Sequence, residues 1–186
     1  MDTEALGEVL ENRVVMVTGA GGSIGSELCR QIARLNPDKL IMLGHGENSI
    51  FSALLSLKER FPVLDIIPII ADVRDQPRLA VVFDRWHPEV IFHTAAHKHV
   101  PLMESNIEEA VTNNILGTRN IVQSALDHDV QRLVICKDVQ DREPVEISDT
   151  FSAETTKVYA FLEAVDIPAD TQIDFVWFHT GNELVR

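Results

Sequence analysis

The chain has 186 residues, a length that suits one domain or one domain with a short appendage. Hydrophobic residues make up 45% of it, enough for one sizeable core, and its formal net charge is −13 without a run of Lys or Arg. This composition argues against nucleic acid or an anionic membrane surface as a partner. A phosphate ligand stays open, because the N–H groups at a helix N-terminus bind phosphate without a cationic side chain.

The first 136 residues alternate short β-branched runs with segments of helical period. Strands are expected at 13–18, 39–43, 66–71, 90–94 and 131–136, and helices at 23–35, 49–61, 76–86 and 108–127. Strands separated by such helices predict right-handed crossovers and therefore a Rossmann-like, doubly wound α/β fold, with a parallel sheet of about five strands. Pro68 lies inside the third strand and indicates an edge position or a bulge.

The pattern changes after residue 136, where a polar stretch at 137–149 predicts a loop or a weak strand. Residues 155–163 and 173–180 are rich in β-branched and aromatic side chains and favour strands, although 151–165 can also be interpreted as a helix. We therefore expect a short, antiparallel β segment at 137–186, distinct from a Rossmann half-domain at 1–136.

A glycine loop follows the first strand, where Thr18 runs into the sequence GAGGSIG and then directly into a helix. We expect Gly19 to allow the tight turn, Gly22 to let a pyrophosphate approach, and Gly25 to permit close packing of helix on strand. The N–H groups of Ser23 and Ile24 would then face the negative charge, helped by the helix dipole. Glycines alone also mark ordinary turns. These glycines lie in the strand–turn–helix context that dinucleotide binding requires, and they therefore predict a dinucleotide site.

Three further loops follow strands of the same sheet. Asp72 and Val73 end the third strand, where an adenine would lie, although Asp72 taken alone is better explained as a helix cap or turn residue. The small residues Ala95 and Ala96 follow the fourth strand and would let backbone pass close to a nicotinamide ribose.

After the second strand, Glu47 is the candidate acid for the ribose 2′-OH, and Asn48 either assists it or caps the next helix. An Arg that could accept a 2′-phosphate does not follow this strand. The expected cofactor is therefore NAD or NADP, with NAD preferred.

Four segments together resemble the polysaccharide-biosynthesis nucleoside-diphosphate-sugar 4,6-dehydratases and epimerases, which are extended short-chain dehydrogenases. They are the glycine loop with Ser26-Glu27-Leu28, then LGHGENS at 43–49, HTAAHKHVPLME at 93–104, and NNILGTRN at 113–120, which contains Asn114. The resemblance covers about residues 8–136. It implies a nicotinamide cofactor that takes a hydride from C4 of a UDP-sugar such as a UDP-N-acetylhexosamine. A dehydratase of this family returns the hydride at C6 after water is eliminated, and an epimerase returns it to the same carbon from the opposite side.

The resemblance also implies a catalytic Tyr with a Lys four residues later, or a Met variant with a Ser-Thr-Asp-Lys set, and the chain departs from both patterns. Its one tyrosine, Tyr159, is followed at that spacing by Glu163, and Met103 is followed by Ile107. After the fifth strand the sequence is Cys136-Lys137-Asp138. Site residues for catalysis are therefore not assigned.

Three hypotheses follow. The first is an NAD(P)-binding module with little or no catalysis by this chain alone. The second is an active dehydratase or epimerase in which Lys157, Lys137 or Asp138 takes an unusual role or a partner chain completes the site. The third is a non-catalytic scaffold or interaction protein, a natural or engineered chimera. The segment from 137 resembles an uncharacterised bacterial β-rich module. Alternatively, 175–184 weakly resembles the family's sixth strand.

Histidines and a lysine surround the fourth strand's end. His93, His97 and His99 lack the acidic neighbours and spacing of a metal site, so a role beside the cofactor or the substrate phosphates is favoured over metal binding. Lys98 could meet a nucleotide phosphate, and a solvated loop lysine is the equal alternative.

The expected setting is a cytoplasmic protein without a membrane span. Only two cysteines, Cys29 and Cys136, are present, and the acidic start lacks the pattern of a signal peptide. The last parallel strand would expose an edge unless the tail or a second chain covers it. We predict that the tail packs on the Rossmann half and that the chain forms a homodimer, with an apolar contact near Phe161 and Trp177.

Overall fold

A computed structural model describes residues 9–135 and the strand residues 139–140, 143–144, 162–165, 177–179 and 182–185. The elements follow the predicted alternation closely. In chain order they are β1 (Val14–Thr18), α2 (Ser23–Ile32), the 3₁₀ turn η1 (Ala33–Leu35), β2 (Lys39–Gly44), α3 (Glu47–Arg60), β3 (Asp65–Ile70), α4 (Gln76–Trp86), β4 (Val90–His93), α5 (Val100–Glu104), α6 (Ile107–Glu109), the π-helix η2 (Ala110–Gly117), α7 (Thr118–Asp127) and β5 (Arg132–Ile135).

The main sheet has the strand order β3-β2-β1-β4-β5, with all five strands parallel. This is the strand order of a Rossmann-like fold, in which the direction of winding reverses between β1 and β4. The predicted fold class is confirmed. Pro68 lies in β3, at the edge of the sheet, as its missing N–H predicts.

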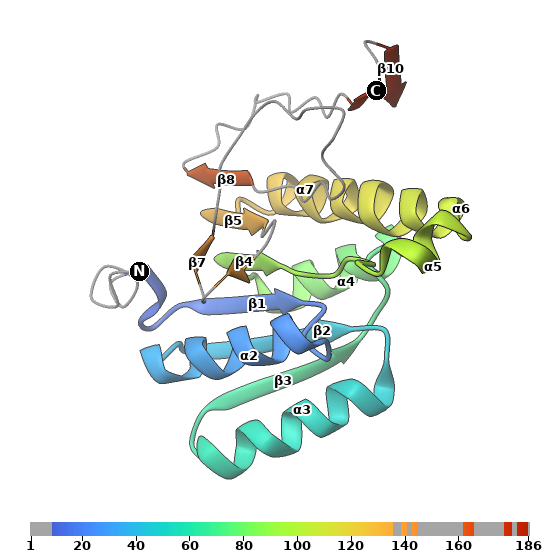
Figure 1. Cartoon of the computed structure of the whole chain (residues 1–186). Coiled ribbons are helices and arrows are strands. Elements are labelled where there is room, and N and C mark those ends of the chain that lie inside the picture. The colour runs from blue at the N-terminus through green and yellow to red at the C-terminus, as the bar shows by residue number, and fades with distance from the viewer. Residues whose placement is uncertain are drawn as a thin grey trace.

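Helices cover both faces of the sheet, with α2 and α3 on one side and α4 and α7 on the other (Figure 1). Alternate residues of each central strand supply two separate cores. Val15 and Val17 of β1 pack with Cys29 and Ile32 of α2, whereas Met16 packs in the core that holds α4 and α7. Strands buried on both faces explain the continuous apolar runs in the sequence.

The segment after β5 adds short strands. β8 (Leu162–Val165) pairs antiparallel with β5 and covers its edge, so a strand from the tail packs on the Rossmann half as predicted. β9 (Trp177–His179) pairs antiparallel with β10 (Asn182–Val185), and β6 (Val139–Gln140) with β7 (Glu143–Pro144). The rest of the predicted tail strands, with Lys157, Tyr159 and Phe161, lies outside the described residues, and the division at residue 136 stays a prediction.

Two helix predictions need correction. The segment 108–127, expected to contain a helix, does so as α7, but residues 110–117 before it form the π-helix η2 and residues 107–109 the short α6. Asn48 does not cap α3, since that helix begins at Glu47 with Gly46 as its N-cap. Within the described part of the chain, none of the helices has the length and apolar character needed to cross a membrane.

Candidate functional site

The glycine loop joins β1 to α2 at the point where the sheet reverses its winding. Gly19 has φ +67°, and a Cβ there would lie 2.8 Å from the backbone of Ala95. A Cβ on Gly25 would collide with the carbonyl of Gly19, so the helix can approach the strand only with glycine at that position. Gly22 is different, because its Cβ would meet only the Gly19 oxygen, at 3.2 Å. The turn and packing roles predicted for Gly19 and Gly25 therefore agree with the geometry, and the space above Gly22 is open.

The N-terminus of α2 is exposed and lacks an acidic side chain. Its N-cap is Gly22, which contributes no side-chain hydrogen bond, and its first turn holds no Asp or Glu. By contrast, α3 carries Glu47 in its first turn, and the Asp75 side chain caps α4 by accepting from Arg78 N–H. The positive end of the α2 dipole, beside Ser23 and Ile24, is therefore not neutralised by the helix's own first turn and favours binding of an anion.

A second loop, which follows β4, lies against the glycine loop. The Thr94 hydroxyl donates to the Thr18 carbonyl over 2.7 Å, and this bond ties the end of β4 to the end of β1. The backbone of Ala95 then passes beside Gly19, while Ala96 and Lys98 are exposed. The structure therefore brings together the residues predicted at the ends of β1 and β4.

Asn114 holds this second loop in place. Its Oδ1 accepts from the His97 N–H at 2.8 Å and its Nδ2 donates to the His97 carbonyl at 2.9 Å. Neighbouring Asn113 is buried, and its amide donates to the Ala95 carbonyl over 3.4 Å. The amide of Asn114, predicted to bind cofactor, is occupied by the backbone of the loop.

His93 is the last residue of β4, within the expected strand, and its burial corrects the role predicted for it beside the cofactor or the substrate phosphates. The ring is buried and lies between two threonines, with Nδ1 2.6 Å from Thr18 Oγ1 and Nε2 2.9 Å from Thr118 Oγ1. Burial lowers the pKa of His93 from 6.5 to about 4. The ring is therefore neutral at pH 7 and is inaccessible to a ligand.

The turn after β3 holds Asp72 and Val73. The Asp72 carboxylate accepts from the Arg74 backbone N–H and from its guanidinium, which holds the pKa of Asp72 below its ordinary value of 3.8. Arg74 also donates to Glu109 over 3.0 Å, across to α6. The cap of α4 is Asp75, so Asp72 is a turn residue and not the helix cap.

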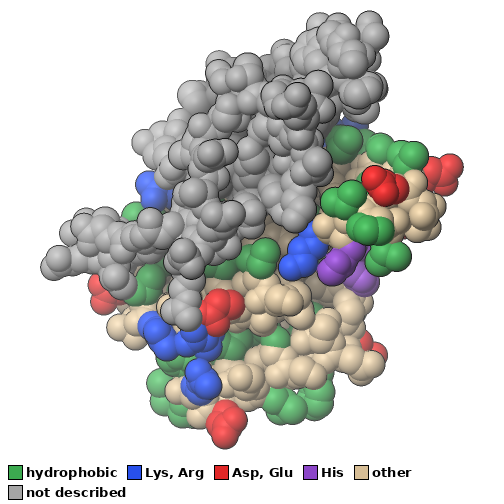
Figure 2. All heavy atoms as spheres, in the orientation of Figure 1, with side chains coloured by type: hydrophobic (Ala, Val, Ile, Leu, Met, Phe, Trp, Pro, Cys, Tyr) green, Lys and Arg blue, Asp and Glu red, His purple; other side chains and the backbone are tan. Residues whose placement is uncertain are grey.

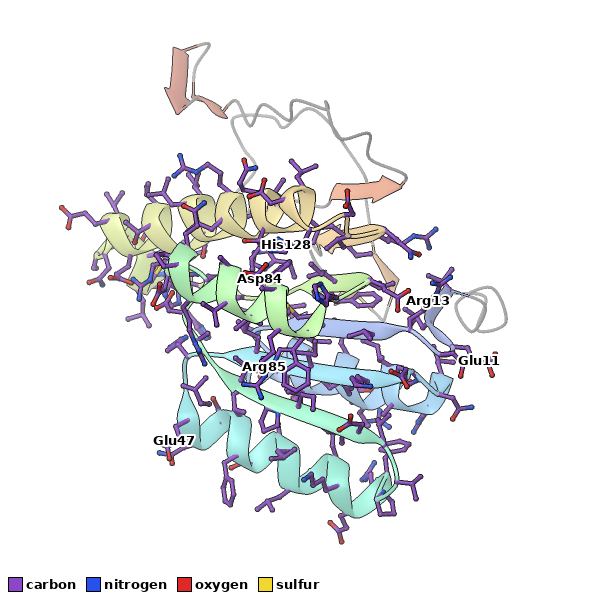
Figure 3. All side chains as sticks on the ribbon, turned by 180° about the vertical axis from the view of Figure 1, so that it is seen from behind. Glu11, Arg13, Glu47, Asp84, Arg85 and His128 are labelled. Carbon is purple, nitrogen blue, oxygen red and sulfur yellow. The ribbon has the colours of Figure 1, made fainter. Side chains whose placement is uncertain are left out.

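Glu47 and Asn48 lie in the first turn of α3, and both are exposed; Figure 3 shows Glu47 at that end of the helix. They are close to the glycine loop, because a Cβ on Gly21 would collide with the Ser49 side chain. The sequence pattern assigned roles to Gly19, Gly22 and Gly25 only, so it did not predict this contact between Gly21 and Ser49.

The exposed face beside α5 carries histidine and basic side chains next to hydrophobic ones (Figure 2). Leu102 of α5 and Ile107 of α6 are 60% and 67% exposed. Among the residues that the structure describes, no three His, Cys, Asp or Glu side chains are arranged to hold a metal ion.

The fold and the glycine loop define the chain's Rossmann-like unit as one of the kind found in sugar-nucleotide epimerases. In a solved UDP-glucose-4-epimerase from Stenotrophomonas maltophila, described with bound NAD and formylated UDP-arabinopyranose, the matching region is 26% identical with a TM-score of 0.66. The match covers 77% of this chain and 44% of the epimerase.

Sequence comparison identifies the family. The model of the family described as polysaccharide biosynthesis protein matches residues 15–178, and the chain belongs to that family. A probable polysaccharide biosynthesis protein EpsC of Bacillus subtilis is 39% identical over 99% of this chain and 30% of its own length. The capsular polysaccharide biosynthesis protein CapD of Staphylococcus aureus is 46% identical over 73% of this chain and 23% of its own length.

These comparisons confirm the predicted resemblance, and they also show how much of each relative the chain matches. The chain spans less than a third of the length of these two curated relatives. The family match continues past residue 136 into the tail, as far as residue 178.

Proposed function

We propose that this chain binds a nicotinamide dinucleotide across the carboxyl ends of β1 and β4, and that it converts little or no sugar nucleotide by itself. The observation that carries the proposal is the exposed N-terminus of α2, which follows a glycine loop with open space at Gly22 and lacks an acidic side chain. A pyrophosphate supplies the negative charge that such a helix end favours. The related epimerase with bound NAD supports the same choice of ligand.

The preferred cofactor is NAD over NADP. A 2′-phosphate would lie beyond the end of β2, where Glu47 is exposed and no Lys or Arg occurs between Lys39 and Lys58. The guanidinium of Arg74, in the turn after the neighbouring strand β3, is already engaged by Asp72 and Glu109. A carboxylate accepts from a ribose hydroxyl and repels a phosphate.

The substrate class we propose is a UDP-sugar, with catalysis that depends on groups outside this chain. Family membership supports the sugar nucleotide, and exposed Lys98 lies in the loop after β4, where it can meet a phosphate. The sequence lacks the Tyr and Lys at a spacing of four on which the family's chemistry depends. Steady conversion of a UDP-N-acetylhexosamine by the purified chain would overturn this part of the proposal.

The binding test is a fluorescence titration with NADH and NADPH on the chain and on Gly22→Val. A Cβ at this position meets only the Gly19 oxygen, so we expect the fold to be retained while the branched side chain of valine occupies the space of the pyrophosphate. Ser56→Val, on an exposed position of α3, is the matched control. We expect saturable binding of NADH, stronger than that of NADPH, in the chain and the control, and its loss in Gly22→Val. Equal NADH affinity in a folded Gly22→Val would contradict the proposed site.

A further inference from the structure

We propose that Asn120 is a positioning residue for the adenosine half of the nucleotide, because its side chain sets the shape of the turn after β3. The inference rests on the proposed function. In a Rossmann-like site the adenosine ribose lies at the end of β2, so the turn after β3 is beside the adenine. Asn120 itself is in α7 and contacts that turn through its side chain.

The contact is made by a single buried amide. Asn120 is 7% exposed, and its Nδ2 donates to the carbonyls of Val73 at 3.1 Å and Arg74 at 3.2 Å. An amide nitrogen has two hydrogens, so it can serve both carbonyls at once. Two successive peptide groups of the turn are thus held by one side chain.

The turn has to obtain these bonds from a side chain, because the backbone of α4 does not supply them. The first carbonyl in the α4 ladder is that of Asp75, which accepts from Leu79 N–H. The N–H of Arg78, one residue earlier, donates to the Asp75 side chain and leaves the Arg74 carbonyl without a helical donor. A carbonyl removed from water without a partner is destabilising, so the donor at Asn120 favours this turn over other shapes.

Gly117, the last residue of η2 and the N-cap of α7, also packs against the turn. A Cβ at residue 117 would lie 2.7 Å from Val73 Cγ2, and Val73 is 4% exposed. Val73 is thus packed against the helix backbone, and this contact fixes the position of the adjacent Asp72 along the turn. There its carboxylate accepts from the Arg74 N–H at 2.9 Å, so its orientation follows the same peptide groups that Asn120 holds.

The test compares Asn120→Asp and Asn120→Leu with Gln123→Leu, which removes an exposed amide of the same helix that donates to Asp127. Dissociation constants are measured for NADH, for ADP, and for reduced nicotinamide mononucleotide, which has no adenosine. We expect both Asn120 variants to bind NADH and ADP about tenfold more weakly, the effect of one lost hydrogen bond. Binding of the mononucleotide should change less than about twofold, since the turn is distant from its site.

Asn120→Asp provides a second readout. Its ionised carboxyl faces two carbonyls and cannot donate, but the protonated form regains one donor, and burial favours that form. The ADP defect relative to the parent chain should therefore shrink as the pH is lowered from 8 to 6. A merely structural role would weaken all three ligands alike, or none of them, without such recovery, and that result would overturn the inference.

Hydrogen exchange of the backbone amides at 72–79 separates this inference from the proposed function. Failure of the parent chain to bind NADH and ADP would refute the nucleotide site. The turn would still be expected to exchange faster in Asn120→Asp than in Gln123→Leu, and equal exchange in the two variants would overturn the positioning role on its own.

Discussion

The buried histidine of β4 predicts that the fold loses stability on mild acidification. Hydrogen bonds determine its protonation. The Thr118 hydroxyl donates to the Asn114 carbonyl over 2.7 Å, so its oxygen is left to accept from His93 Nε2–H. On the other side, Thr94 N–H donates to Thr18 Oγ1, and the Thr18 hydroxyl hydrogen is then directed to Nδ1. We assign the neutral tautomer with its proton on Nε2, because the reverse arrangement leaves the Thr18 hydroxyl without an acceptor among the described residues.

The size of the effect follows from the two pKa values. The pKa of His93 is about 4 in the fold, against 6.5 for an exposed histidine. Between these values the unfolded chain binds a proton that the folded chain does not, so stability falls as pH falls from 6.5 and the loss is complete below about 4. The full difference corresponds to about 3 kcal/mol, and about 2 kcal/mol of it is lost by pH 5.

The assay is urea unfolding of the chain and of His93→Asn between pH 7.5 and pH 5. Asparagine does not titrate, and its Oδ1 can still accept from Thr18. Other shifted groups are constant in this window: the pKa of Asp72 lies below its ordinary 3.8, and that of Cys29 is raised by burial to about 12. The parent chain should lose about 2 kcal/mol more than the variant.

Two results would refute this reasoning. One is a free energy of unfolding that changes with pH equally in the parent chain and in folded His93→Asn. The other is an NMR titration of the His93 ring that shows a pKa above 6 or a proton on Nδ1, because either would mean that burial and the two threonines do not select the neutral Nε2–H form.

Two further predictions concern the glycine loop and the tail. Gly25→Ala should lower the free energy of unfolding by about 1–3 kcal/mol, because the added Cβ meets the Gly19 carbonyl and neither backbone can yield; a loss no larger than that of Ser26→Ala in denaturant melts would contradict this. Deleting residues 150–186 removes β8 from the edge of β5 and should cause aggregation or loss of cooperative unfolding. A monomeric deletion variant with an unchanged melting temperature would show the tail to be an independent appendage.

Much of the fold could be predicted because its signals are local. Each parallel strand is buried on both faces and so appears as a continuous apolar run, and the helices between them have the expected length. The glycine loop is local as well, since Gly19 and Gly25 contact each other across only six residues. Even the edge position of Pro68 follows from its own missing N–H.

The parts that could not be predicted depend on partners distant in the sequence. His93 is separated from Thr18 by 75 residues and from Thr118 by 25, so nothing beside it distinguishes a buried strand residue from a ligand in a loop. Asn120 bonds to carbonyls 46 and 47 residues away. The π-helix was missed because apolar periodicity does not separate it from an α-helix over eight residues.

The run NNILGTRN resembled a family motif, and the structure explains why its polar residues are there. Asn114 holds the loop after β4, Thr118 bonds to His93 at the end of β4, and Asn120 holds the turn after β3. One stretch of helix therefore connects to the loops after β4 and β3, which lie on either side of β1 and β2 in the sheet, while the glycine loop follows β1 between them. A ligand that spans this crevice contacts loops whose spacing is determined by η2 and α7, so the distance between its two halves depends on a helix that need not touch it.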